Sequence, residues 1–463
     1  MTNLWAGVGR CDITPAPGTP QGGWGAQTHQ RGLGSDLPFY ATALVVSTSD
    51  VSAVIIDVDS IGFDKEWTVK IIDTVAELTR VPREHVRLSC SHTHSGANTF
   101  RLGAISEGLD MARQYLDGLP LRIAGAAWHA QQNLKQVRCA AGTGTCEIGV
   151  NRRFKTSTGQ MVVGRNWNGP VDNTVRVVRF DDLDEHPVAT IVHYACHPTT
   201  MAWQCQYFTP DYPGMARQVV EDQALGTCLF LQGAAGDVHT RRGHGGDLQV
   251  YRRWGKLLGL EASRVATGIE TLPRRETFQG LMPSGATIAL YKETPEELAD
   301  PTVSVVSRVL ELPLKQFSPP DQLDAETKEL LRELESLRRK GDDDEIRLAT
   351  ARVTQSGIQS ELARQFFGKT HADWQLQAIR IGAVALLSIP GEPFVEISQQ
   401  IVKGSPFQHT LFSGYSNGGF GYLPIRTAYE EGGYEVDVTP FSPDAAEIVV
   451  SKATSLLREL QEL

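Results

Sequence analysis

The sequence predicts an α/β protein in which mixed sheets are flanked by helices and the functional residues lie in loops at strand ends. Over the first third of the chain, apolar runs of strand length alternate with helical patterns. Several of these runs end in histidine, glycine and small polar residues, which is typical of sites built at the ends of strands. One charge-rich helical stretch, residues 319–367, interrupts the alternation.

The expected elements follow in chain order. Strands are expected at ATALVVSTS (41–49), SAVIIDVDS (52–60), HVRLSC (85–90), CEIGV (146–150), TVRVVRF (174–180), ATIVHYA (189–195) and, as a pair, WQLQAIRIGAVALLSIPGEPF (374–394). Helices are expected at 67–79, 107–133 and 442–460. Residues 319–367 predict a helical hairpin broken at KGDDD, interpreted as a solvated insertion, with a lid or an oligomer surface as alternatives. We expect residues 1–463 to form one domain with this insertion inside it.

Composition excludes several classes of protein. The 463 residues are 41% hydrophobic and 21% charged, as in ordinary globular proteins. The net charge of -10 and the lack of a long basic cluster argue against a nucleic-acid partner. The sequence contains no run of about 18 apolar residues, so it predicts no membrane span. The N-terminus lacks a signal-peptide pattern, so we expect a cytoplasmic protein. Seven cysteines without a CxxC pair predict reduced core residues rather than disulfides.

Two histidine motifs follow strand-like runs. SHTHSG carries His92 and His94, which would share one face of a strand and reach one cavity; ordinary hydrogen-bonded histidines are the alternative. In TIVHYACHPTTM, His193 lies within the apolar run and is expected in the core. His197 lies at the strand exit and is the better ligand candidate.

Three further loops carry polar candidates. FLQGAAGDVHTRRGHGG (230–246) contains Asp237 and His239 but lacks the GxxxxGK[ST] pattern of a nucleotide loop. SIPGEPF places Glu392 on a Pro-Gly corner, either as an exposed turn residue or as a metal ligand. Residues 414–435 are rich in glycine and carry tyrosines at 415, 422, 429 and 434. Histidine, glutamate and tyrosine without thiolate indicate zinc, which can activate water for hydrolysis.

In order, VGRCDITP, SHTHSG, VHYACHPTTM, TPDYPG, QGAAGDVH, IPGEPF and GFGYLPIRTAYEEGGYE resemble the N-terminal catalytic domain of the neutral, non-lysosomal ceramidases. The resemblance covers nearly the whole chain except the helical insertion. It implies a zinc ion held by His92, His197, Glu392 and Tyr422. It also implies that His94 and Tyr434 contact the substrate carbonyl and the developing oxyanion, and that Arg152 lines the site.

The chain departs from this family in ways that bear on the substrate. His239 stands where the family has a serine and could act as an acid or base near pH 7, or as an extra ligand. No C-terminal immunoglobulin-like domain, secretion signal or amphipathic docking element is seen in the sequence, so we expect no stable membrane association.

The leading hypothesis is therefore a zinc hydrolase that cleaves the amide bond of a small soluble N-acyl or cyclic amide compound. A ceramidase proper and a zinc-dependent ester, lactone or glycoside hydrolase are the alternatives. For a glycoside, the candidate carboxylates are Asp57, Asp59, Asp211 and Asp237. A non-catalytic binding protein is a further alternative, and a homo-oligomer is left open.

Overall fold

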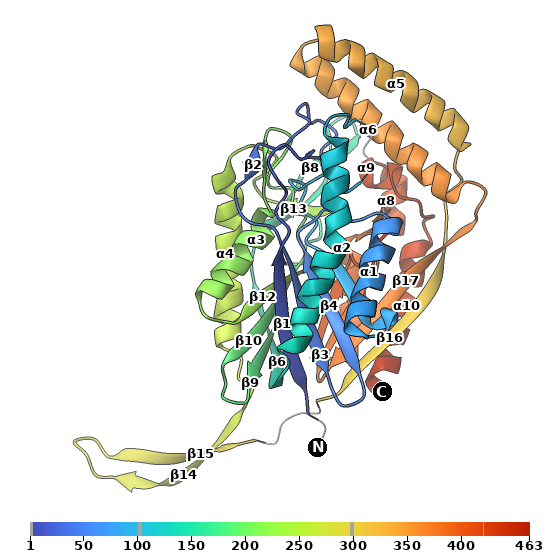
Figure 1. Ribbon diagram of the computed structural model, residues 1–463. Coiled ribbons are helices and arrows are strands. Elements are labelled where there is room, and N and C mark those ends of the chain that lie inside the picture. The colour runs from blue at the N-terminus through green and yellow to red at the C-terminus, as the bar shows by residue number, and fades with distance from the viewer. Residues whose placement is uncertain (1–2, 101–103, 297–300, 420) are drawn as a thin grey trace.

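Two sheets packed face to face form the centre of the computed structural model, which describes residues 3–100, 104–296, 301–419 and 421–463. The larger sheet has the order β12-β10-β9-β6-β1-β3-β4-β5 (Figure 1). Its strands are β1 (Trp5–Asp12), β3 (Tyr40–Ser47), β4 (Ser52–Val58), β5 (Val86–Cys90), β6 (Lys135–Thr145), β9 (Thr174–Asp182), β10 (Pro187–Tyr194) and β12 (Thr227–Gln232). Pairs β4/β5 and β10/β12 are parallel and the other neighbours are antiparallel, so the sheet is mixed.

The second sheet has the order β16-β17-β18-β20. Its strands are β16 (Val303–Pro313), β17 (His371–Ile381), β18 (Val384–Ser388) and β20 (His409–Ser413). Alternate side chains of both sheets, such as Ile55, Leu231 and Leu386, meet in one buried cluster between them. Because β4 is buried on both faces, it reads as a continuous apolar run, VII, rather than as an alternating pattern.

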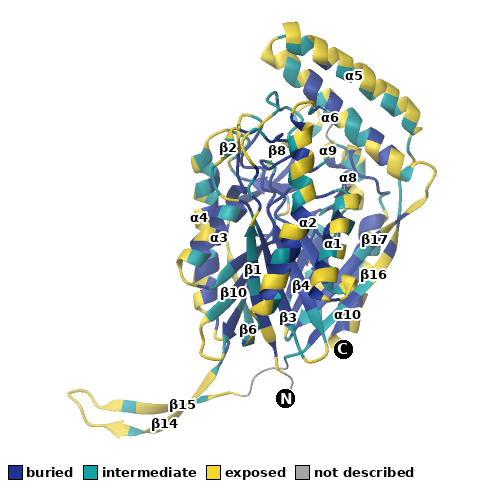
Figure 2. Cartoon of the chain, in the orientation of Figure 1, coloured by how far each residue is buried: buried dark blue, intermediate teal, exposed yellow. Residues whose placement is uncertain are grey.

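Helices cover the outer faces of both sheets, giving four layers. The helices are α1 (Lys65–Thr79), α2 (Leu109–Gln132), α3 (Asp211–Asp222) and α4 (Leu248–Thr267) on the larger sheet, and α7 (Val395–Gly404) and α10 (Ala445–Glu462) on the smaller one. Figure 2 shows the buried strands between exposed helix faces. The α/β class with mixed sheets flanked by helices is thereby confirmed. None of the helices in the described part of the chain combines the length and the apolar character that a membrane crossing requires.

Two antiparallel helices, α5 (Pro320–Lys340) and α6 (Asp343–Phe366), lie at one end of the sandwich (Figure 1). Asp342 begins α6 with a capping box: its side chain accepts from backbone amides and Glu345 reaches back to its own amide. Buried Leu334, Ala349 and Val353 join the two helices.

Short elements complete the fold around the site. They are β2 (Gly34–Ser35), the 3₁₀ helix η1 (Arg83–His85), β7 (Gly149–Lys155), β8 (Met161–Asn166), β11 (Tyr207–Phe208), β13 (Val238–Thr240), β19 (Glu392–Pro393), β21 (Tyr422–Leu423), α8 (Arg426–Glu431) and α9 (Tyr434–Asp437). The strand expected at 146–150 is instead the junction of β6 and β7, because Cys146 to Ile148 connect two different sheets.

Several elements lie outside the expected set, among them α3, α4 and α7, and one further addition stands apart from the body of the protein. β14 (Arg274–Met282) and β15 (Ile288–Pro295) form a separate two-stranded ribbon that projects from the end of the molecule opposite to α5 and α6 (Figure 1).

Candidate metal centre

The loop after β5 brings His92 and His94 together through a backbone turn. His92 has φ 65°, an uncommon value for a non-glycine residue, and its amide donates to the carbonyl of Ser60 at 2.8 Å. The turn leaves the two Nε2 atoms 3.3 Å apart. The two side chains therefore converge because the strand ends at Cys90, not because they alternate along it.

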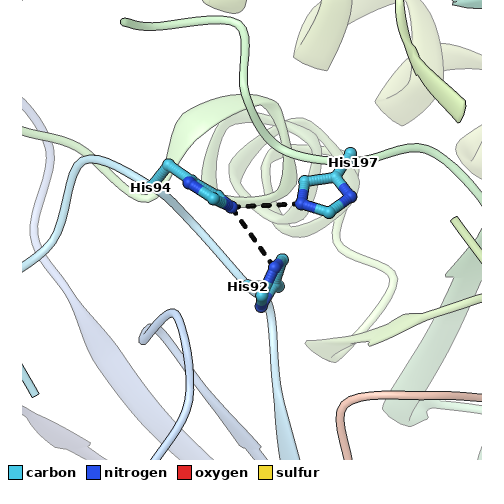
Figure 3. Close-up of side chains that lie close together, drawn as sticks. All are labelled: His92, His94 and His197. Carbon is cyan, nitrogen blue, oxygen red and sulfur yellow. Dashed lines mark hydrogen bonds between the residues drawn. The ribbon is translucent and has the colours of Figure 1, made fainter. Parts of the chain in front are cut away.

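His197 joins them from the loop after β10. Its Nε2 lies 3.1 Å from Nε2 of His94, and its ring centroid lies 4.6 Å from that of His92 (Figure 3). These three histidines form the buried cluster in which one nitrogen of each lies within 4.8 Å of the others. His193 lies earlier in the chain, on β10 itself. It is buried and its Nε2 donates to the carbonyl of Phe412, as expected of a core histidine.

The hydrogen bonds made by Nδ1 of each ring decide which ring nitrogen is free to bind a metal. Nδ1 of His92, His94 and His197 lies 2.5, 2.8 and 3.0 Å from the carbonyl oxygens of Ile61, Gly23 and Ala235, respectively. A carbonyl oxygen only accepts, so each Nδ1 carries the hydrogen and each Nε2 presents a lone pair. The short Nε2 separations are then contacts between lone pairs, which a shared cation would stabilise.

Burial keeps these rings in the form that binds metals. It lowers the pKa of both His94 and His197 well below the ordinary histidine value. Neighbouring positive groups, including Arg152 beside His197, act in the same direction. Both imidazoles are therefore neutral at physiological pH, as a metal ligand must be.

Glu392 adds an oxygen donor from the Pro-Gly corner. Its Oε2 lies 3.4 Å from Nε2 of His92 and 3.6 Å from Nε2 of His197. This oxygen is buried and has no hydrogen-bond partner among the described residues. A buried carboxylate oxygen beside the nitrogen lone pairs of His92 and His197 is a favourable place for a cation. Nitrogen and oxygen donors of this kind, without thiolate, fit zinc.

Tyr422 lies beside Glu392, because β19 and β21 pair in parallel and place the two residues in register. The Arg152 guanidinium lies over the Tyr422 ring, 5.2 Å from its centroid. The ring of Tyr434 is 5.7 Å from that of Tyr422, and Tyr434 is 40% exposed, so it lies at the mouth of the site. Arg152 also forms an ion pair with Glu435, with 2.8 Å between Nε and Oε1.

His239 lies on β13, next to the segment that carries His197. Its backbone forms a bridge with His197, but its side chain turns to His244, with 3.1 Å between Nδ1 and Nε2. Burial, together with His244 and nearby arginines, lowers the pKa of His239 to about 2. It is a neutral imidazole near pH 7, so it holds no extra proton to transfer to a leaving group.

Two aromatic residues near the cluster were not assigned to the site from the sequence. The Tyr415 ring lies 4.3 Å from that of His92, and its buried hydroxyl has no partner among the described residues. Trp24 lies 5.5 Å from His94 and 5.4 Å from His244 between ring centroids. The density of tyrosine in residues 414–435 was the only available signal for Tyr415, and none existed for Trp24.

The four aspartates considered for glycoside cleavage are buried and committed to other partners. Asp57 and Asp59 both pair with Arg217. Asp211 accepts backbone amides of Thr200 and Met201, and Asp237 accepts the amide of Val395. None of them is among the described residues that line the cavity at the histidines.

That cavity has a mainly apolar lining. Ile61, Leu88 and Val438 line it together with His92, His94, Glu392, Tyr415, Tyr422 and Tyr434, and its volume is about 120 Å³. It leads into a groove of about 1,090 Å³ between α1 and the α5–α6 pair, since Phe63, Thr68, Thr354 and Ile358 line both spaces. The centre is therefore reached from the end of the molecule that α6 covers.

Three comparisons relate the chain to known proteins. The family model "Neutral/alkaline non-lysosomal ceramidase, N-terminal" matches residues 5–236, half of the chain. Neutral ceramidase of Oryza sativa subsp. japonica is 25% identical over 226 residues, which is 47% of this chain and 29% of the rice protein. The chain thus matches less than a third of the length of that relative.

Solved structures extend the similarity of fold to the full length. The crystal structure of neutral ceramidase from Pseudomonas aeruginosa has a TM-score of 0.68 at 17% identity and covers 100% of this chain and 75% of that one. A structure titled "Ceramidase complexed with C2" has a TM-score of 0.66 at 17% identity, with 100% and 76% coverage. The resemblance inferred from the ordered motifs is confirmed: the chain belongs to the neutral/alkaline non-lysosomal ceramidase family.

Proposed function

We propose that this protein is a zinc-dependent hydrolase that cleaves the amide bond of an N-acyl compound with a soluble polar part. The observation that carries the proposal is the convergence of three Nε2 lone pairs, with the partnerless Glu392 Oε2 beside those of His92 and His197. Family membership supports hydrolysis of an amide bond. We assign His92, His197, Glu392 and Tyr422 as the zinc ligands.

Bound zinc would polarise a carbonyl and lower the pKa of a water molecule towards 7, which supplies a nucleophile without a serine. The protein's own groups then orient the reaction. His94, whose Nδ1 donates to the carbonyl of Gly23, is assigned to contact the substrate rather than the metal. The Tyr434 hydroxyl donates a hydrogen bond to the oxygen on which negative charge develops.

Arg152 and Glu435 position Tyr422. Their buried pair holds the guanidinium over Tyr422, which keeps that ring in place beside Glu392. His239 and His244, both kept neutral by burial, are assigned to binding the leaving portion rather than to proton transfer.

The shape and charge of the approach support the substrate class. The apolar lining of the cavity favours an acyl chain, because burial there removes apolar surface from water. The outer groove carries charges of both signs, from Lys65, Arg83, Lys328, Arg364 and Lys369 and from Asp64, Glu66, Glu84, Asp324, Glu361 and Asp373. Such a wall favours a polar substrate part over a second long hydrocarbon chain, so we rank a soluble N-acyl compound above ceramide.

The metal is tested with His92→Ala and Glu392→Ala, with exposed His371→Ala as the matched control. Elemental analysis should find zinc in the wild type and the control and strongly reduced zinc in the two site variants. Full occupancy in both site variants would refute the ligand assignment.

The substrate is tested separately with a panel of soluble N-acyl compounds, ceramides, lactones and aryl glycosides. We expect turnover of N-acyl compounds that is lost in Glu392→Ala. Turnover confined to ceramides would overturn the substrate class but not the metal centre. Zinc without turnover of any compound would favour a binding protein.

A further inference from the structure

The ribbon of β14 and β15 stands away from the body of the protein. Eight cross-strand pairs join the two strands, from Arg274↔Pro295 to Met282↔Ile288. Nearly all of its residues are exposed, as Figure 2 shows in yellow. At its base, Arg274 forms an ion pair with Glu185 of the body. The ribbon is therefore anchored at one end and free along the rest of its length.

The free part is apolar on both of its faces. Cross-strand register places Phe278 with Tyr291 on one face, where their rings lie 6.1 Å apart, and Met282 with Ile288 on the other. Six large apolar side chains are between 43% and 65% exposed: Phe278, Leu281, Met282, Ile288, Leu290 and Tyr291. Single exposed apolar residues are ordinary on a protein surface, but six on one thin projection are not.

An isolated ribbon of this kind is poorly stable in water. Two strands alone cannot bury an apolar face, and both of their outer edges leave backbone groups free to pair with another chain. Packing against another surface would bury the apolar faces and pair the free backbone groups. The apolar residues thus indicate an interface.

We propose that residues 274–295 form an arm that packs on a second copy of this chain, and that two copies exchange their arms about a twofold axis. If each of the six side chains buries roughly 80 Å², two arms and the surfaces that receive them bury roughly 2,000 Å² in total. That area is within the range of stable, specific interfaces, roughly 1,200 to 2,000 Å².

The charges at the base favour another copy over a lipid surface. The stretch from Thr277 to Tyr291 carries no charged residue. Glu276 and Glu293 lie at the base on the face of Phe278, whereas Arg275 and Lys292 lie on the opposite face. Exchanged arms can match opposite charges, whereas an anionic membrane would select basic residues alone.

The location of the arm also favours a second copy of this chain over a membrane. The cavity at the histidines opens beside Thr354 and Ile358 of α6, and α6 lies at the end opposite to the ribbon (Figure 1). A membrane bound to the arm would lie at the wrong end of the molecule for delivery of a lipid to the site. A second copy bound there leaves both sites open to solvent.

Sedimentation velocity and light scattering test the arm over a wide range of protein concentration. The wild type should have twice the 50.7 kDa chain mass. The variant Phe278→Thr, Leu281→Thr, Tyr291→Thr should be a monomer, because threonine keeps the strand propensity but removes the apolar surface. The matched control Leu348→Gln changes a leucine of α6 that is 60% exposed, against 65% for Leu281, and should remain a dimer.

Amide hydrogen exchange of the unmodified protein provides a measurement that does not depend on how the triple variant folds. Amides of β14 and β15 should be protected at high concentration and lose protection on dilution. A wild type that is monomeric throughout, or a triple variant that dimerises as the wild type does, overturns the proposal. A monomeric wild type that sediments with anionic phospholipid vesicles, while the triple variant does not, assigns the arm to membranes instead.

Discussion

Arg217 offers the sharpest test of how the fold supports the histidine turn. Its two terminal nitrogens each lie 2.5 Å from a carboxylate oxygen, one of Asp57 and one of Asp59, and all three side chains are buried. Asp59 also accepts the hydroxyl of Ser91 at 3.1 Å, directly before His92. The arginine therefore neutralises two carboxylates that lie beneath the candidate metal centre.

Replacing Arg217 with methionine keeps much of the volume but leaves two buried carboxylates without a counter-charge. Removing one partner of a buried ion pair costs about 3 to 5 kcal/mol, because the remaining charge is desolvated and unpaired. We expect a loss of that size in the free energy of unfolding, together with weaker zinc retention as the turn at His92 loosens.

The loss of stability in Arg217→Met should depend on pH, and the direction of that dependence follows from the pKa of Asp57. Burial raises the pKa of Asp57 to about 6, even though Arg217 beside it acts to lower it. The folded-state pKa is above the ordinary value of about 3.9, so the folded protein holds this proton more tightly and stability falls as pH rises from about 4 to 6. Without Arg217 the pKa rises further, so the deficit of the variant is larger at pH 8 than at pH 5.

Urea unfolding followed by circular dichroism at both pH values measures this deficit. Arg264→Met is the control: its ion pair with Glu261 is exposed on the arginine side, and such pairs contribute about 0 to 1 kcal/mol. A deficit for Arg217→Met below about 1 kcal/mol, or one that is equal at the two pH values, would refute the reasoning.

Three further predictions concern the site. His94→Ala should keep its zinc but lose at least about tenfold in kcat, because it removes a substrate-facing group; zinc loss equal to that of His92→Ala would make His94 a ligand. Ile358→Trp should lower kcat/KM for long acyl chains more than for acetyl compounds, because Ile358 lines both the cavity and the groove; an equal effect on both would place the acyl chain elsewhere. Tyr415→Phe removes a buried hydroxyl without a partner among the described residues, so its thermal midpoint should not fall while activity does; a clear loss of stability would show that the hydroxyl is satisfied in solution.

Some elements could be read from local pattern alone. The apolar run SAVIIDV is strand β4, and residues 65–79 form α1 where a helix was expected at 67–79. These segments are buried between layers, and burial imposes the apolar repeat that makes them recognisable. The ribbon of β14 and β15 has no such burial, and neither strand carries the repeat of a half-buried sheet.

The residues of the candidate site divide in the same way, into those that a local sequence pattern indicates and those that it does not. His92, His197 and Glu392 attract attention because each follows an apolar run and precedes small or turn residues. Tyr415 and Glu435 do not, because their importance comes from the ring contact with His92 and the ion pair with Arg152, made with residues hundreds of positions earlier in the chain. The role suggested for His239 as an acid or base depended on a pKa near 7, and burial removes that condition.

By itself, the sequence determined the α/β class, the order of the motifs and the kinds of donor atom available, because these follow from residue type and short-range period. Only the tertiary structure decided which nitrogen of each histidine is free. That choice depends on three carbonyl oxygens, those of Ile61, Gly23 and Ala235, which come from loops distant in sequence. The turn at His92 and the approach of the loops after β5, β10 and β18 then bring the free lone pairs to one point, which no spacing along the chain specifies.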